Sequence, residues 1–281
     1  MIGLTISMYK NKIPLKQYIE EHPITSHYNK KVPKILRGKM TDNFFHISQM
    51  IAFLYGLPKK FTFTDIMRSL EVQRWFRMSS QWIENIPKSW PLVIVANHPH
   101  ILVDQFAIGS LLESIRPQSE IKIITDNTPE GFEDIYPYSE RVGKTPEAKQ
   151  VFRDNINSLL KNNGTVIIFP SGKLTYRHFF TGEIIEDRWR SGALHFARYA
   201  QAPILPIFIS SKTTAIYNLC SNFFSRQTMQ WLNFRQALKK EMYIGLSVWE
   251  ALIPSDNISP EDLRDIVYEL WNENYILKEK K

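Results

Sequence analysis

The pattern of apolar and polar positions divides most of the chain into two regions. From about residue 42 to residue 90 the pattern is rich in aromatic residues and indicates helices. After Pro91, short continuous apolar runs alternate with amphipathic stretches. Such runs are typical of strands buried on both faces of a sheet. The predicted strands are LVIVA (92–96), IKII (121–124), TVIIF (165–169), ILPIFI (204–209) and YIGLSV (243–248).

Two stretches carry clear helix signals. Thr145 is the predicted N-cap of a helix that has Pro146 in its first turn and ends before Gly164. The predicted apolar face of this helix consists of Ala148, Val151, Phe152, Ile156, Leu159 and Leu160. A second helix is predicted from Ser259 to about Tyr275. Because strands and helices alternate, we expect an α/β fold: a mostly parallel central sheet flanked by helices, with an N-terminal helical extension.

The beginning of the chain differs from the remainder. Residues 1–40 carry eight Lys and Arg side chains and no clear period, and Phe44–Leu57 is the most apolar stretch. This stretch is shorter than the roughly 20 apolar residues that span a bilayer, so it indicates either a buried helix or a helix at a membrane surface. We expect residues 1–69 to form a basic arm and aromatic helical extension, and residues 70–281 to form the α/β domain.

Charge and cysteine usage narrow the classes of partner. The net charge of +7 favours anionic partners such as nucleic acid, phosphorylated molecules or an anionic membrane, although solubility alone would also explain it. No recognised nucleic-acid motif accompanies the basic residues, so no nucleic-acid partner is expected. Cys220 is the only cysteine, which excludes an internal disulfide and a zinc site built from cysteines, and indicates a cytosolic protein or one that faces the cytosol.

Histidine and carboxylate side chains that could act in catalysis follow the first predicted strand of the sheet. In parallel sheets, ligands bind beyond the carboxyl ends of the strands. There the sequence reads Asn97-His98-Pro99-His100, and Asp104 follows within the first turn of the next predicted helix. Pro99 holds His98 extended, and Asp104 is near enough to fold back towards it. A carboxylate that orients a histidine is a general-base arrangement.

Other interpretations of this stretch stay open. The spacing alone is also that of an ordinary turn, with an incidental loop histidine and an acidic first-turn residue. His100 and Asp104 lie four residues apart, as metal ligands on a helix do, but no third ligand follows, so no metal is expected. The chain has no G-x-S-x-G nucleophile elbow, and Cys220 has no reactive-cysteine signature. A histidine base would therefore have to activate a substrate hydroxyl or a water molecule.

A second strand ends in a turn near several cations. Gly172-Lys173 is not a P-loop, because Leu174 stands where that motif needs Ser or Thr. Lys173 and Arg177 on this segment, and Arg141 with Lys144 on another, could bind a phosphate group. For any one of them, composition alone favours a solvated surface charge.

Taken together, three stretches resemble the motif blocks of the glycerolipid acyltransferase superfamily: NHPHILVD, GTVIIFPSGKLT and WRSGALHFARYAQAPILPIFI. The resemblance covers about residues 70–255. It implies an O-acyltransferase that moves a fatty acyl group from acyl-CoA or acyl-carrier protein to a hydroxyl of a lysolipid or glycerol-phosphate-type acceptor, without a cofactor. It also implies a cytoplasmic protein that is peripheral on the inner face of the membrane and takes part in phospholipid biosynthesis.

The resemblance assigns roles to individual residues. His98 would be the base, Asp104 its orienting partner, and Asn97 would shape the turn. The acceptor pocket would be lined by Phe169, Pro170, Ser171, Gly172 and Lys173, together with Arg177. The arginine that binds the acceptor phosphate in the family has Arg141 as its nearest counterpart by position.

Two departures from the family pattern bear on the acceptor. Five residues separate His98 from Asp104, where the commonest family form has four, and Ser171 replaces a glutamate. The longer spacing is similar to the hemolysin-like branch, which includes acyltransferases that act on lyso-ornithine lipids. Two alternatives therefore remain: a non-catalytic lipid-binding or scaffold protein on the same fold, and an acyltransferase whose acceptor is a specialised metabolite.

Overall fold

The computed structural model describes residues 62–72, 74–100, 103–125, 138–211, 213–221 and 241–279, with side chains as far as residue 270. All of these residues fall in one of the two compact units into which the chain divides, Thr62–Asp126 together with Tyr138–Lys281. The basic arm and the Phe44–Leu57 stretch lie outside the described residues, and the domain boundary after residue 69 stays a prediction. No helix among the described residues is long and apolar enough to cross a membrane.

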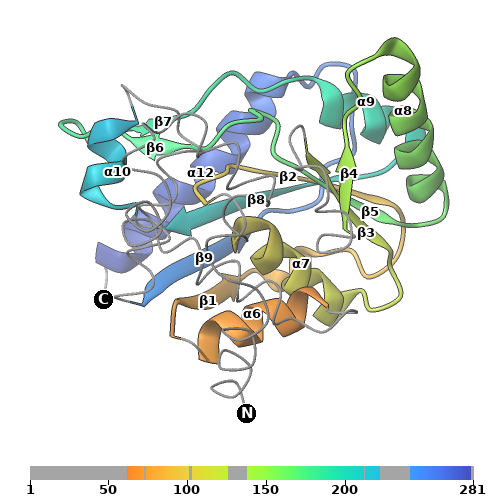
Figure 1. Ribbon diagram of the computed structural model, residues 1–281. Coiled ribbons are helices and arrows are strands. Elements are labelled where there is room, and N and C mark those ends of the chain that lie inside the picture. Colours follow the sequence, from red (N-terminus) through yellow and green to blue (C-terminus); the bar gives the residue numbers. More distant parts are fainter. Residues whose placement is uncertain are drawn as a thin grey trace, which may run out of the picture. The chain divides into compact units, whose positions relative to one another are not determined.

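A seven-stranded sheet forms the centre of this unit, in the order β1-β9-β8-β2-β5-β3-β4 (Figure 1). All neighbouring strands are parallel except β8 and β9. The predicted α/β class and the five predicted strands are therefore confirmed. The strands are β1 Phe76–Gln81, β2 Leu92–Ala96, β3 Ile121–Thr125, β4 Ser139–Arg141, β5 Thr165–Ile168, β8 Ile204–Ser211 and β9 Met242–Val248.

Strand β1 corrects the helical interpretation of the segment before Pro91. Residues Phe76–Gln81 pair in parallel with β9, from Phe76 opposite Met242 to Gln81 opposite Ser247. Only the first residue of β1 is buried, so the sequence of the strand has no apolar run from which it could be predicted. Its conformation depends on a partner more than 160 residues away along the chain, which a local pattern cannot reveal.

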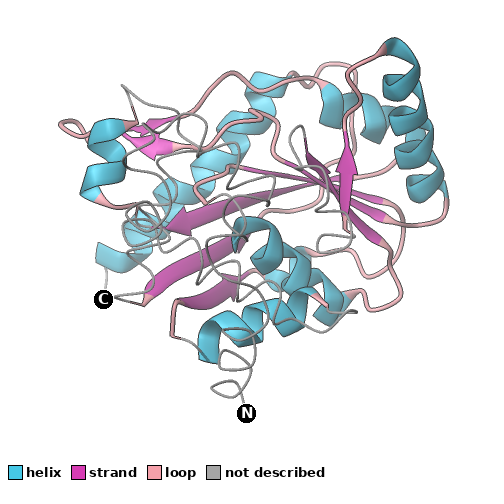
Figure 2. Cartoon of the chain, viewed as in Figure 1, coloured by secondary structure: helices cyan, strands magenta, loops and turns pink. Residues whose placement is uncertain are grey.

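Helices cover both faces of the sheet (Figures 1 and 2). Helix α6 (Phe63–Val72) packs against α7 (Val103–Ile115) on one face. On the other face lie α8 (Pro146–Lys161), α9 (Gly192–Ala200) and α12 (Pro260–Glu279). The core on this second face joins β2, β5 and β8 to the three helices, and includes Val93, Val95, Phe152, Ile156, Val166, Leu194, Phe208, Leu263 and Val267.

Helix α8 begins as predicted, but its apolar face is narrower. The Thr145 side chain accepts a hydrogen bond from the Ala148 N–H at 3.2 Å. Phe152, Ile156, Leu159 and Leu160 are buried, whereas Ala148 and Val151 are exposed. Val151 precedes Phe152 by one residue and therefore projects about 100° away from it around the helix.

The carboxyl ends of the central strands meet at one edge of the sheet. Val95 lies opposite Ile168 of β5, and Ala96 lies opposite Ile207 of β8. The segments that follow β2 and β5 therefore start beside each other. A small antiparallel hairpin, β6 (Tyr176–Arg177) with β7 (Ile184–Ile185), follows β5, and the short helix α10 (Ala215–Cys220) follows β8.

Candidate active site

His98 and Asp104 form a buried pair at this edge. Asp104 is fully buried in the first turn of α7, and its Oδ2 atom lies 2.9 Å from His98 Nδ1. The same oxygen accepts a hydrogen bond of 2.6 Å from the His100 N–H. A carboxylate at Nδ1 makes this nitrogen the donor, so Nε2 is the nitrogen able to accept a proton. The structure thus brings together the two residues that the sequence paired, in the geometry of an oriented base.

His100 is held by different contacts. Its side chain is buried, its Nε2 atom lies 2.6 Å from Ser211 Oγ on β8, and its ring meets the ring of Phe76 edge-on at 5.9 Å. Its backbone N–H donates to Asp104. These contacts favour a structural role for His100. In the described part of the chain, no group of three His, Cys, Asp or Glu side chains is placed to hold a metal ion.

The segment after β5, which we call the FPSGK loop (Phe169–Lys173), touches the pair directly. The Phe169 ring stacks on the His98 ring with centroids 4.1 Å apart and an angle of 21° between the planes. Gly172 has φ of +62°, a conformation that glycine adopts without strain, and its N–H donates to Phe169 O at 2.9 Å. The Ser171 hydroxyl donates to Lys173 O at 2.9 Å. These bonds hold the turn closed while Phe169 covers one face of the histidine.

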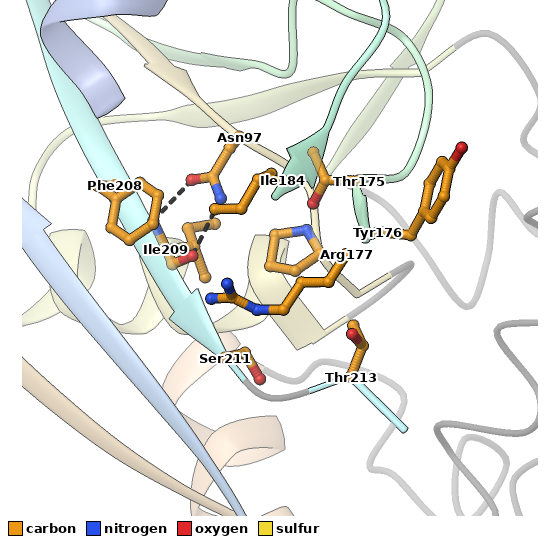
Figure 3. Close-up of a pocket in the computed structure, with 10 residues that line it drawn as sticks. Asn97, Thr175, Tyr176, Arg177, Ile184, Phe208, Ile209, Ser211 and Thr213 are labelled. Carbon is orange, nitrogen blue, oxygen red and sulfur yellow. Dashed lines mark hydrogen bonds between the residues drawn. The ribbon is translucent and has the colours of Figure 1, made fainter. Parts of the chain in front are cut away.

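Asn97 joins the ends of β2 and β8. Its Nδ2 atom donates to Ile209 O at 3.0 Å, and its Oδ1 atom accepts from Ile209 N at 2.7 Å, as Figure 3 shows. This pair of bonds fixes the turn from which His98 projects. Thr175 N also donates to His98 O at 2.8 Å, so the backbone of the histidine is held from the FPSGK side as well.

A cavity of about 20 Å³, enough for about one water molecule, lies beside Asn97. Arg177 lines it, and in Figure 3 its side chain extends towards β8. The guanidinium donates to Gly182 O at 3.2 Å. Burial lowers the pKa of Arg177 from its usual range, but a guanidinium keeps its charge at neutral pH. A half-buried positive charge therefore lies close to the strand end that carries His98.

The remaining predicted cations lie elsewhere. Lys173 is half-exposed and forms an ion pair of 2.6 Å with Asp187. Arg141 is exposed at the end of the edge strand β4, three strands away from β2. At the usual spacing of neighbouring strands this separation is roughly 14 Å. Arg177, and not Arg141, thus lines the cavity beside Asn97.

Sequence reasoning missed two polar residues near the site. Ser211 binds His100, and a serine at a strand end gives no signal of such a role. Glu186 accepts a hydrogen bond of 2.8 Å from the Tyr268 hydroxyl, and burial, the largest cause, raises the pKa of Glu186 to about 7. Its partner on α12 is 82 residues away, so no local pattern identifies it.

Comparisons with known proteins find a similarity to one family in the region that carries this geometry. Residues 77–210 match the family model described as Acyltransferase. No curated protein sequence matches the chain. Among solved structures, the chain is similar to the crystal structure of the 1-acyl-sn-glycerophosphate (LPA) acyltransferase PlsC from Thermotoga maritima, with 16% identity, 100% of this chain and 95% of that chain covered, and a TM-score of 0.48. Residues 77–210, which contain His98, Asp104 and the FPSGK loop, are therefore similar to the Acyltransferase family.

Proposed function

We propose that the protein is an O-acyltransferase that moves a fatty acyl group from an acyl thioester, acyl-CoA or acyl-carrier protein, to a hydroxyl of a lysolipid or glycerol-phosphate-type acceptor. The observation that carries this proposal is the buried contact of 2.9 Å between His98 Nδ1 and Asp104 Oδ2 inside the matched domain. In this proposal His98 is the general base and Asp104 orients it. The longer spacing between them remains our reason to expect an acceptor like those of the hemolysin-like branch.

Direct transfer follows from this arrangement. His98 Nε2 takes the proton of the acceptor hydroxyl while the hydroxyl oxygen attacks the thioester carbonyl carbon. The tetrahedral intermediate collapses by breaking the carbon–sulfur bond, and the imidazolium returns its proton to the leaving thiolate. The products are an acyl ester and a free thiol, so the reaction consumes no oxidant, metal or cofactor. Asp104 stabilises the imidazolium between these two steps.

Arg177 is the cation we propose for an anionic acceptor group. It lines the cavity beside Asn97, which immediately precedes the base, and a partly buried guanidinium binds phosphate or carboxylate through paired hydrogen bonds. The FPSGK loop forms the neighbouring wall of the acceptor site. Arg141 is the weaker candidate, because it lies on the far edge strand.

A lipid acceptor requires contact with a membrane, and the turn of the β6–β7 hairpin suits this contact. Phe180 is 83% exposed and Phe179 is 44% exposed, and their rings pack edge-on at 5.2 Å. This turn follows Arg177 along the chain, and the net charge of +7 favours an anionic lipid surface. We propose that the protein binds the inner face of the membrane peripherally, with this turn at the surface.

Vesicle sedimentation tests this contact. Binding to anionic vesicles should weaken in Phe180→Ser. It should persist in Ile253→Ser, because Ile253 is equally exposed but follows Leu252, which bridges to the opposite end of β8. Equal binding by both variants and the wild type would contradict a role for the hairpin.

Thiol release tests the activity itself. The purified protein, given acyl-CoA and a lysolipid extract, should release free thiol in proportion to the acyl ester formed. A lipid-binding or scaffold protein on the same fold would bind the lipids and release no thiol. Release that depends on a water-soluble acceptor but not on lysolipid would instead support a specialised-metabolite acceptor.

A further inference from the structure

The segment Glu186–Arg190 runs along the FPSGK loop and contacts it at successive positions. Arg190 N donates to Pro170 O at 3.1 Å, and Asp187 forms the 2.6 Å ion pair with Lys173. The Arg190 guanidinium also lies beside Gly172, at 3.6 Å from where a Cβ atom would stand. The loop is therefore fastened along its length to a segment that the proposed chemistry does not use.

Glu186 is a half-buried member of this segment, and its Oε1 atom is buried. The Tyr268 hydroxyl donates to its Oε2 atom at 2.8 Å, and the Ser171 hydroxyl and the Trp189 indole both face the carboxyl group. Within the described residues, neither Glu186 Oε1 nor Trp189 Nε1 completes a hydrogen bond. A buried carboxylate with one unsatisfied oxygen is unfavourable, and burial raises the pKa of Glu186 to about 7.

Other titratable and charged groups around this carboxyl group come from two elements. Tyr268 and Arg264 face it from α12, and Arg177 of β6 lies near the Tyr268 hydroxyl. Burial and the neighbouring Glu186 raise the pKa of Tyr268, so its hydroxyl stays protonated and remains a donor. Arg264 lowers the pKa of Glu186, but less than burial raises it. Near neutral pH the group that changes charge in this cluster is therefore Glu186.

Ser171 links Glu186 to the loop. A serine hydroxyl has one proton to donate, and here Ser171 donates it to Lys173 O across the turn. An ionised Glu186 needs donors for Oε1 and competes for the same proton. A neutral Glu186 competes much less, so the turn keeps the bond that closes it.

We propose that Glu186 is a positioning residue of this acyltransferase: in its neutral form it leaves the FPSGK loop closed with Phe169 stacked on His98, and in its ionised form it draws the Ser171 hydroxyl away and loosens that stack. The inference rests on the proposed function. Glu186 touches no reacting atom in this scheme and acts on the base through Ser171 and Phe169.

The pH dependence of kcat/KM tests the proposal. A base must be unprotonated to act, so kcat/KM rises with pH on the acid side of the profile. On the alkaline side, ionisation of Glu186 loosens the FPSGK loop, and kcat/KM should fall. One pH unit above the midpoint of Glu186 ionisation, only about a tenth of the protein keeps a neutral Glu186. There kcat/KM should be about tenfold lower than the value for protein in which Glu186 is fully neutral. Glu186→Gln carries no ionisable group and should lose the alkaline fall.

Asp187→Asn provides the matched control. It changes the adjacent residue and breaks the Lys173 ion pair, but leaves Glu186 in place, so the alkaline fall should persist. An alkaline fall with the same midpoint in Glu186→Gln would overturn the proposal.

A spectroscopic measurement tests the titration without any turnover. In protein labelled with 5-fluorotryptophan, the Trp189 signal, assigned with Trp189→Phe, should shift with a midpoint near pH 7 in the wild type and should not shift in Glu186→Gln. A Trp189 signal that is constant across this range in the wild type would refute the titration of Glu186. A shifting Trp189 signal in a protein that transfers no acyl group at any pH would count against the proposed function instead.

Discussion

Replacing Glu186 by glutamine should make the protein more stable above neutral pH. Glutamine keeps the volume of the side chain and an oxygen that accepts the bond from Tyr268, but it cannot ionise. The wild-type carboxyl group has an ordinary pKa of 4.5 when exposed and a pKa of about 7 in the folded protein, because burial disfavours its charge. The folded state therefore binds more protons than the unfolded state between these two values.

The sign and size of the effect follow from this difference. Where the folded state holds the extra proton, the free energy of unfolding falls as pH rises. Glu186 therefore does not lower the free energy of unfolding below about pH 4.5, and it lowers this free energy by its full amount above about pH 7. A difference of about 2.5 pKa units corresponds to about 3 kcal/mol at pH 8.

Urea denaturation followed by circular dichroism at several pH values between 4 and 8 measures this quantity. The advantage of Glu186→Gln over the wild type should grow through this range by about 3 kcal/mol, because the other titrating groups are common to both proteins and cancel. Asp187→Asn should show no such growth. An advantage of Glu186→Gln that is the same at pH 4 and pH 8 would refute the reasoning.

Three further predictions concern packing and the site. Gly109→Ala would place a Cβ atom 2.3 Å from Phe63 Cγ between α7 and α6, and should lower the free energy of unfolding by about 1–3 kcal/mol in the same denaturation assay; a neutral effect would contradict this packing. Asp104→Asn should reduce kcat by roughly a hundred- to ten-thousandfold with an unchanged circular dichroism spectrum, and wild-type turnover would exclude the orienting role. Arg177→Ala should raise KM for an anionic acceptor about tenfold, the equivalent of one hydrogen bond to a charged group, while Arg141→Ala should leave it unchanged; the reverse result would restore Arg141 as the acceptor ligand.

The features that could be predicted from the sequence are those that local chemistry decides. The strands β2 and β5 are continuous apolar runs, and Thr145 with Pro146 marks the start of α8 whatever packs against it. Strand β1 was missed because its conformation is set by pairing with β9. The exposure of Val151 was missed because the width of an apolar face depends on which neighbours cover it.

The same distinction holds for the candidate site. His98 and Asp104 are only six residues apart, so Pro99 and the start of α7 are enough to bring them together. The hydrogen bonds of His100 with Ser211 and of Glu186 with Tyr268 join elements 111 and 82 residues apart, and only the folded chain reveals them. The choice between Arg141 and Arg177 likewise depends on how the strands are arranged, because each arginine ends a short strand and the sequence does not show which of them lies near β2.

The assignment of His98 as the base is tested most directly by mass spectrometry of the lipids made by cells that express the protein. Cells with the wild-type chain should contain an acylated lipid that cells with His98→Ala lack. Cells with His100→Ala should still contain it, provided that circular dichroism shows both variants to be folded. Loss of the product in His100→Ala with retention in His98→Ala would contradict the assignment, and identical lipids in all three would contradict the acyltransferase function.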